Sequence, residues 1–115
     1  DSEVNFIPMR GDFARGIFAS VYLKSDLSEK EAHDLFDSYY QDSPFVHRSN
    51  QSISVKDAVN TNNGLLHVSK IGNKIRIESA IDNLLKGAAG QAVQNMNLIM
   101  DWEEGLGLRL KANAF

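Results

Sequence analysis

A short stretch near the C-terminus carries the residues best suited to binding a ligand. An extended segment ends here and a long helix is expected to begin, and the candidate residues lie within eight positions of each other: Asn83, Lys86, Gly87 and Gly90. Glycine weakens a helix interior by about 1 kcal/mol relative to alanine, so two glycines in one run need a reason. Small residues let a backbone or a ligand come close, and the positive end of a helix dipole attracts anions. The pattern indicates either a ligand pocket or a tightly packed buried helix.

The rest of this helix has two distinct faces. Apolar side chains recur at helical spacing and predict one of them: Leu85, Ala89, Val93, Met96 and Met100. Neutral hydrogen-bonding side chains form the other: Gln91, Gln94 and Asn95. A solvated face would carry more Lys and Glu. Composition alone favours a buried helix whose apolar stripe lies in the core.

Three basic side chains are candidates for holding an anion. Arg15 stands just before an expected strand, where its guanidinium could grip a carboxylate or phosphate through two parallel hydrogen bonds. A surface or interface ion pair is the alternative for Arg15. Arg10 is a weaker candidate for the same task. Lys86 could act likewise at the start of the helix, where a solvated lysine is the alternative.

The histidines and the missing cysteines limit the possible chemistry. We expect His33 on the solvated side of a helix and His67 beside Glu78 across a hairpin, while His47 has no clear assignment. No histidine is spaced with another histidine or with carboxylates as metal ligands are, so we expect no metal site. The absence of cysteine excludes disulfides and a thiol nucleophile, and it fits a reducing compartment.

Length and composition describe an ordinary globular domain. The 115 residues can form a hydrophobic core, and the net charge is −3. Lys and Arg are scattered, which argues against nucleic-acid binding. No apolar run is long enough to cross a membrane, and no signal peptide is visible. We therefore expect one cytoplasmic domain over 1–115, without nucleic-acid or membrane partners.

Periodicity and turn residues predict the elements that position the candidate site. The expected strands are Val4 to Ile7, Gly16 to Lys24, Phe45 to Arg48, Leu65 to Ile71 and Lys74 to Ile81, with Ser54 to Thr61 ambiguous between a strand and a loop. A capping box at Ser28 and Glu31 starts a helix that should end near Tyr40 or Gln41.

The turn Gly72-Asn73 predicts a hairpin whose register can be written down. Pairing Ile71 with Lys74 places Val68 opposite Ile77. With the ambiguous segment counted as a strand, the order is β-β-α-β-β-β-β-α, which indicates an α+β fold with a mainly antiparallel or mixed sheet. We expect the first helix to cover one sheet face and the other face to be free for a partner.

Two blocks of sequence carry a family resemblance. The run from Asp82 to Gln94 resembles the C-terminal helix of N-acetyl-gamma-glutamyl-phosphate reductases, which are NADP-dependent enzymes of arginine biosynthesis, and more distantly that of aspartate-semialdehyde dehydrogenases. The run from Phe6 to Ile17 resembles the same family through Phe-x-Pro followed by Arg-Gly-Ile at the family's interval. The blocks occur in family order, and the resemblance covers nearly the whole chain.

The resemblance implies a function for a larger protein. The family reduces N-acetyl-glutamyl 5-phosphate to the 5-semialdehyde, through a thioester on a cysteine and hydride from NADPH. Both the cysteine and its partner histidine lie upstream in the family, so we expect no catalytic residue in this chain and no activity from it alone. The chain begins at Asp1 without methionine, as a piece of a longer protein would. Its segment 81–115 would then include a helix that packs on a separate nucleotide-binding domain.

The resemblance also assigns roles to individual residues. It implies that Arg15, and less strongly Arg10 and Lys86, contact the acyl-phosphate substrate. It implies that Asn83 and Gly87 lie near NADP, with the N–H groups of Gly87 exposed. For Asn83, the alternative is a structural role as the N-cap of the helix. The resemblance further implies a homodimer, in which the open sheet face would pair the two subunits.

The sequence departs from the family at Met9, where some members carry histidine, so no role of that histidine transfers. Two other interpretations stay open. The chain could be a non-catalytic dimerisation or assembly module that reuses this fold. The parent protein could instead be an aspartate-semialdehyde dehydrogenase.

Overall fold

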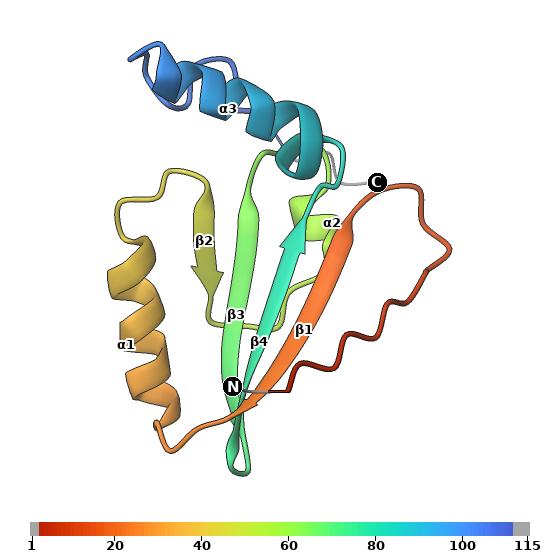
Figure 1. Ribbon diagram of the computed structural model, residues 1–115, viewed down its shortest axis with the longest axis vertical. Helices are drawn as coiled ribbons and strands as arrows, with labels where there is room; N and C mark the ends of the chain where they lie inside the picture. The colour runs from red at the N-terminus through yellow and green to blue at the C-terminus, as the bar shows by residue number, and fades with distance from the viewer. Residues whose placement is uncertain (1–2, 112–115) are drawn as a thin grey trace.

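The computed structural model describes residues 3–111, so the expected limits at 1 and 115 lie outside the described part. It has the predicted α+β fold, built on a four-stranded mixed sheet in the order β1-β4-β3-β2 (Figure 1). The strands are β1 (Ile17–Lys24), β2 (Val46–Ser49), β3 (Gly64–Ile71) and β4 (Lys74–Ile81). β1 and β3 both run antiparallel to β4, and β2 runs parallel to β3.

The central hairpin has the predicted register. β3 and β4 pair Ile71 with Lys74 and Val68 with Ile77. Gly72 adopts a φ of 59°, which the tight turn requires and which glycine adopts without steric cost. Because the register places Val68 and Ile77 on one face, this pair helps to fix which sheet face is buried.

Helix α1 (Glu29–Tyr40) begins and ends where the sequence predicts. The Ser28 side chain accepts the N–H of Glu31, and the Glu31 carboxylate accepts the N–H of Ser28 in return. The helix places Ala32 against Val68 and Ile75 of the sheet, and these three buried residues form one core cluster. α1 therefore covers one face of the sheet, as expected.

The strand expected at Val4 to Ile7 is wrong. The segment from Glu3 to Gly16 forms no strand, and Figure 1 shows it running outside the sheet. β1 is an edge strand, but this segment does not pair with its open side. Pro8 lacks a backbone N–H and so removes one donor that such pairing would use.

The ambiguous segment Ser54 to Thr61 contains a short helix, α2 (Val55–Ala58), rather than a strand. Its N-terminus has a capping box like that of α1, in which the Asp57 carboxylate accepts the N–H of Ser54 at 2.8 Å. Its residue Ala58 packs with Ile53 against Ala80 of β4, on the sheet face opposite α1. The expectation that this face is entirely free is therefore wrong at the end near Ala80.

The predicted C-terminal helix is present, in two parts. A π-helical turn, η1 (Leu85–Ala89), leads into α3 (Gly90–Ile99), which lies across one end of the sheet (Figure 1). The described helices are all too short and polar to cross a membrane.

The buried side of this C-terminal helix is polar, so the interpretation of its apolar stripe as core is wrong. Gln94 and Asn97 are buried, whereas Met96 and Met100 are exposed. The Asn97 Nδ2 donates to the carbonyl oxygens of Glu104 and Leu106, each at 3.0 Å. The polar side faces inward because the chain that returns after α3 offers it backbone acceptors.

The two glycines at the start of this helix have different surroundings. A Cβ on Gly90 would lie 1.7 Å from Asn62 Oδ1 and 2.8 Å from the carbonyl oxygen of Leu85. Asn62 is itself fixed, because its Nδ2 donates to the Leu108 carbonyl at 2.8 Å. A Cβ on Gly87 would meet nothing closer than 3.5 Å. Gly90 is therefore required by packing within this chain, and Gly87 is not.

Substituting each glycine separates these two cases. We expect Gly90→Ala to lower the free energy of unfolding by about 1–3 kcal/mol, because the new methyl group overlaps buried atoms. Gly87→Ala should leave the stability unchanged or raise it by up to about 1 kcal/mol, because alanine favours the helix. Urea denaturation of both variants measures the difference, and equal stabilities would contradict the assigned role of Gly90.

Candidate functional site

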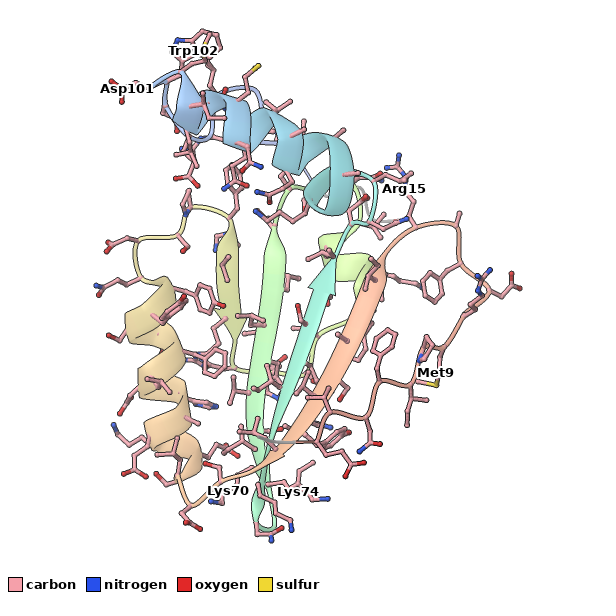
Figure 2. All side chains as sticks on the ribbon, viewed as in Figure 1. Met9, Arg15, Lys70, Lys74, Asp101 and Trp102 are labelled. Atoms are coloured by element: carbon pink, nitrogen blue, oxygen red, sulfur yellow. The ribbon has the colours of Figure 1, made fainter. Side chains whose placement is uncertain are left out.

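The candidate site lies where β1 begins and β4 ends. The two strands are antiparallel and pair Ile17 with Ile81. Their pairing places Arg15 and Gly16 beside Asp82 and Asn83, although 67 positions separate the partners in sequence. Figure 2 shows Arg15 here, close to the start of the C-terminal helix.

Arg15 is held on one side only. Its Nη1 donates to Asn60 Oδ1 at 2.5 Å and lies 3.5 Å from Asp82 Oδ2. The side chain is 39% exposed. Within residues 3–111 its Nε and Nη2 donate no hydrogen bond to the protein. These two donors have the fork geometry that binds a carboxylate or a phosphate.

Asp82 is the buried centre of the site. Its side chain has no exposed surface. One oxygen accepts the N–H of Asn60 at 2.8 Å, and the other accepts those of Leu84 and Leu85 at 2.8 and 2.9 Å. Burial acts to raise the pKa of Asp82, but these three N–H donors and the charge of Arg15 outweigh it and lower the pKa. Asp82 is therefore an anion at neutral pH, and it caps the C-terminal helix.

Asn83 does not cap the helix, so that alternative is wrong. Its Oδ1 accepts the N–H of Gly16 at 2.7 Å, which ties the segment before β1 to the end of β4. Among the described residues, no acceptor is bound to Asn83 Nδ2. The amide group therefore combines a structural acceptor with an available donor.

Lys86 and Gly87 both donate hydrogen bonds within the chain. The N–H of Gly87 donates to the Asp82 carbonyl at 2.9 Å, so the expectation that it is exposed for a ligand is wrong. This bond spans five positions, as in a π-helical turn, and the N–H of Ala89 reaches the Leu84 carbonyl in the same way. Lys86 Nζ donates to Gln94 Oε1 at 2.6 Å and lies 5.7 Å from the Phe45 ring centroid. Burial lowers the pKa of Lys86, and Glu104 opposes that shift.

Arg10 and Met9 lie in the exposed segment before β1, and Met9 projects from it in Figure 2. In the described part of the chain, Arg10 makes no hydrogen bond or ion pair. The structure thus joins Arg15 to Asn83 through Asp82, and it leaves Arg10 outside this network.

The histidines take up structural positions. His33 is half-buried, against the expectation of a solvated residue, and its Nε2 donates to the Val68 carbonyl at 2.7 Å. His67 lies opposite Glu78, as predicted. Residues 3–111 contain no group of three His, Cys, Asp or Glu side chains able to hold a metal.

The sequence reasoning missed Asn60 and Asp82 as site residues. Asp82 had a usable signal, because an acidic residue directly before a helix is a common N-cap. Asn60 adopts a φ of 63°, a left-handed conformation that asparagine tolerates better than most residues. Asn60 lies 45 positions from Arg15 in sequence, and only the folded sheet places the two side by side.

The charge of Asp82 makes stability depend on pH. Its pKa in the folded state is below the ordinary value of 3.8, so its stabilising contribution is present above pH 3.8 and is lost as the pH falls through the folded-state pKa. Asp82→Asn should therefore cost about 2 kcal/mol of unfolding free energy at neutral pH. The difference from wild type should shrink in acid. Denaturant titrations across pH measure it, with the exposed Asp34→Asn as control; a pH-independent difference would contradict the account.

Comparison with known proteins places the chain in a family. The model of the semialdehyde dehydrogenase dimerisation domain matches residues 1–83. N-acetyl-gamma-glutamyl-phosphate reductase of Azobacteroides pseudotrichonymphae is 55% identical over 99% of this chain, and that of Bacteroides thetaiotaomicron is 52% identical over 100% of it. The chain spans 36% of the length of each of these relatives. The matched segment contains Arg15, Asn60, Asp82 and Asn83, and the chain belongs to the semialdehyde dehydrogenase dimerisation-domain family.

Proposed function

We propose that this chain is the substrate-binding and dimerisation part of an N-acetyl-gamma-glutamyl-phosphate reductase of arginine biosynthesis, working in the cytoplasm. The parent protein would convert N-acetyl-glutamyl 5-phosphate, NADPH and a proton into the 5-semialdehyde, phosphate and NADP⁺. The observation that carries the proposal is the identity of 50% or more, over nearly the whole chain, to proteins of that name. The chain alone would be inactive, because it has no cysteine to act as the nucleophile.

Arg15 is the proposed main contact to the substrate. Its Nε and Nη2 are available, and its Nη1 is held by Asn60 and Asp82. A guanidinium fixed in this way loses little freedom when it binds a carboxylate or a phosphate, both of which the proposed substrate carries. Arg10 and Lys86 are secondary candidates, and Lys86 would have to exchange Gln94 for the substrate.

Asn83 and Gly87 are the proposed neighbours of NADP, which supplies the hydride when it is bound. The available Nδ2 of Asn83 suits an amide or phosphate acceptor on the cofactor. Gly87 is exposed and has no side chain, so a cofactor can approach its backbone closely. The nucleotide-binding domain and the catalytic cysteine and histidine would lie elsewhere in the parent polypeptide.

The reductase assignment is tested with the full-length parent protein. It should oxidise NADPH in the presence of N-acetyl-glutamyl phosphate, and Arg15→Lys should lower kcat/KM by about 10- to 100-fold, as expected when one or two charge-assisted hydrogen bonds are lost. The exposed Arg109→Lys is the matched control and should behave as wild type. Faster NADPH oxidation with aspartyl phosphate would identify an aspartate-semialdehyde dehydrogenase instead, and no oxidation with either would favour an assembly module.

We also propose that the protein forms a homodimer through the open sheet face, meaning the part of the face opposite α1 that α2 leaves uncovered. On β1 that face carries the exposed side chains of Phe18 and Tyr22. Their register partners on β4 are Ala80 and Arg76, respectively. Exposed aromatic side chains such as these are enriched in protein interfaces.

Two neighbouring residues of β1 test which face forms the interface. Tyr22 is 56% exposed on the open sheet face, and Val21 is 52% exposed on the α1 side. Tyr22→Lys should convert the full-length dimer to monomer in sedimentation velocity, because a buried lysine opposite Arg76 of β4 would be an unpaired charge. Val21→Lys should leave the dimer intact. The opposite pattern would move the interface to the α1 side.

A further inference from the structure

We infer that Asn60 and Asp82 are positioning residues that fix the Arg15 guanidinium for substrate and link it to the start of the C-terminal helix. The inference rests on the proposed function, because it takes Arg15 as the substrate contact. Neither Asn60 nor Asp82 is expected to touch the substrate itself.

Asn60 acts as a bridge between the two charged groups. Its side-chain Oδ1 accepts from Arg15 Nη1 at 2.5 Å, and its backbone N–H donates to Asp82 Oδ2 at 2.8 Å. The positive φ of Asn60 allows one residue to present both groups on the same side. Arg15 Nη1 is thereby oriented by a neutral acceptor and by a carboxylate together, so the guanidinium plane is defined while Nε and Nη2 stay available.

Asp82 connects the two halves of the proposed site. Its donors come from three segments, represented by Arg15, Asn60 and the helix start at Leu84 and Leu85. Because the carboxylate is fully buried, water cannot replace a lost donor, and the three segments must hold their places together. The adjacent Asn83 is the proposed contact to the cofactor, so a change at Asp82 should affect the binding of both ligands.

The two residues therefore differ in what they should control. The side chain of Asn60 contacts Arg15 and should act on the substrate side alone, since only the backbone N–H of Asn60 reaches Asp82. Asp82 contacts both Arg15 and the helix start, so it acts on the substrate side and on the cofactor side. A general loss of structure would change the KM for the acyl phosphate and the KM for NADPH together in both variants, and would not leave one of them unchanged in the Asn60 variant.

Steady-state kinetics of the full-length protein test this division. Asn60→Gly is compatible with the positive φ and keeps the backbone N–H, while it removes the side-chain amide and with it the Oδ1 that accepts from Arg15. It should raise the KM for the acyl phosphate about 10-fold and leave the KM for NADPH unchanged. Asp82→Asn should raise both. Asn63→Gly, in the same loop, is the matched control and should change neither value.

A double-mutant cycle shows whether Asn60 acts through Arg15. In an Arg15→Ala background, Asn60→Gly should have no further effect on the KM for the acyl phosphate. If its effect is as large as in the wild-type background, Asn60 has a merely structural role and the inference is overturned.

A crystal structure of full-length Asn60→Gly provides a readout that does not depend on activity. The guanidinium of Arg15 should leave its wild-type position or occupy several orientations. An unmoved guanidinium would overturn the inference, and so would a moved one with an unchanged KM. Absence of reductase activity in the wild type would instead reject the proposed function, and the crystal structure would still decide whether Asn60 and Asp82 position Arg15.

Discussion

A fully buried carboxylate, that of Asp82, is the constraint on which the candidate site depends. A buried anion is tolerated only where donors surround it. Here the donors are backbone N–H groups from the loop after α2 and from the start of η1, together with the guanidinium of Arg15. Satisfying this one group requires the segment before β1, the loop after α2 and the C-terminal helix to meet at one end of the sheet.

The C-terminal helix follows from the same constraint. Asp82 caps it, and the π-helical turn then uses the Gly87 N–H within the chain. Further along, Gly90 makes room for Asn62, and Asn97 binds the carbonyl groups of the returning chain. The polar side of the helix is therefore the one that this domain buries. The apolar side chains Met96 and Met100 on its other side are exposed.

The sequence predicts best those features whose determinants are local. The capping box at Ser28 and the turn at Gly72 specify their helix and hairpin through contacts within a few residues, and both predictions are confirmed. The strand at Val4 to Ile7 does not form although β1 has an open edge, because pairing depends on non-local contacts that the local pattern does not reveal. Asn60 shows the same limit for the site, since its partner Arg15 lies 45 positions away and only the fold joins them.

We propose that Arg15 binds substrate with one edge of its guanidinium while Asn60 and Asp82 hold the other. The most direct test is a crystal structure of the full-length protein with a non-hydrolysable phosphonate analogue of the acyl phosphate. We expect Nε and Nη2 of Arg15 to contact the carboxylate or phosphonate oxygens, with Nη1 still bonded to Asn60. An analogue bound without contact to Arg15, or an Arg15 that abandons Asn60 and Asp82 to reach it, would contradict the account.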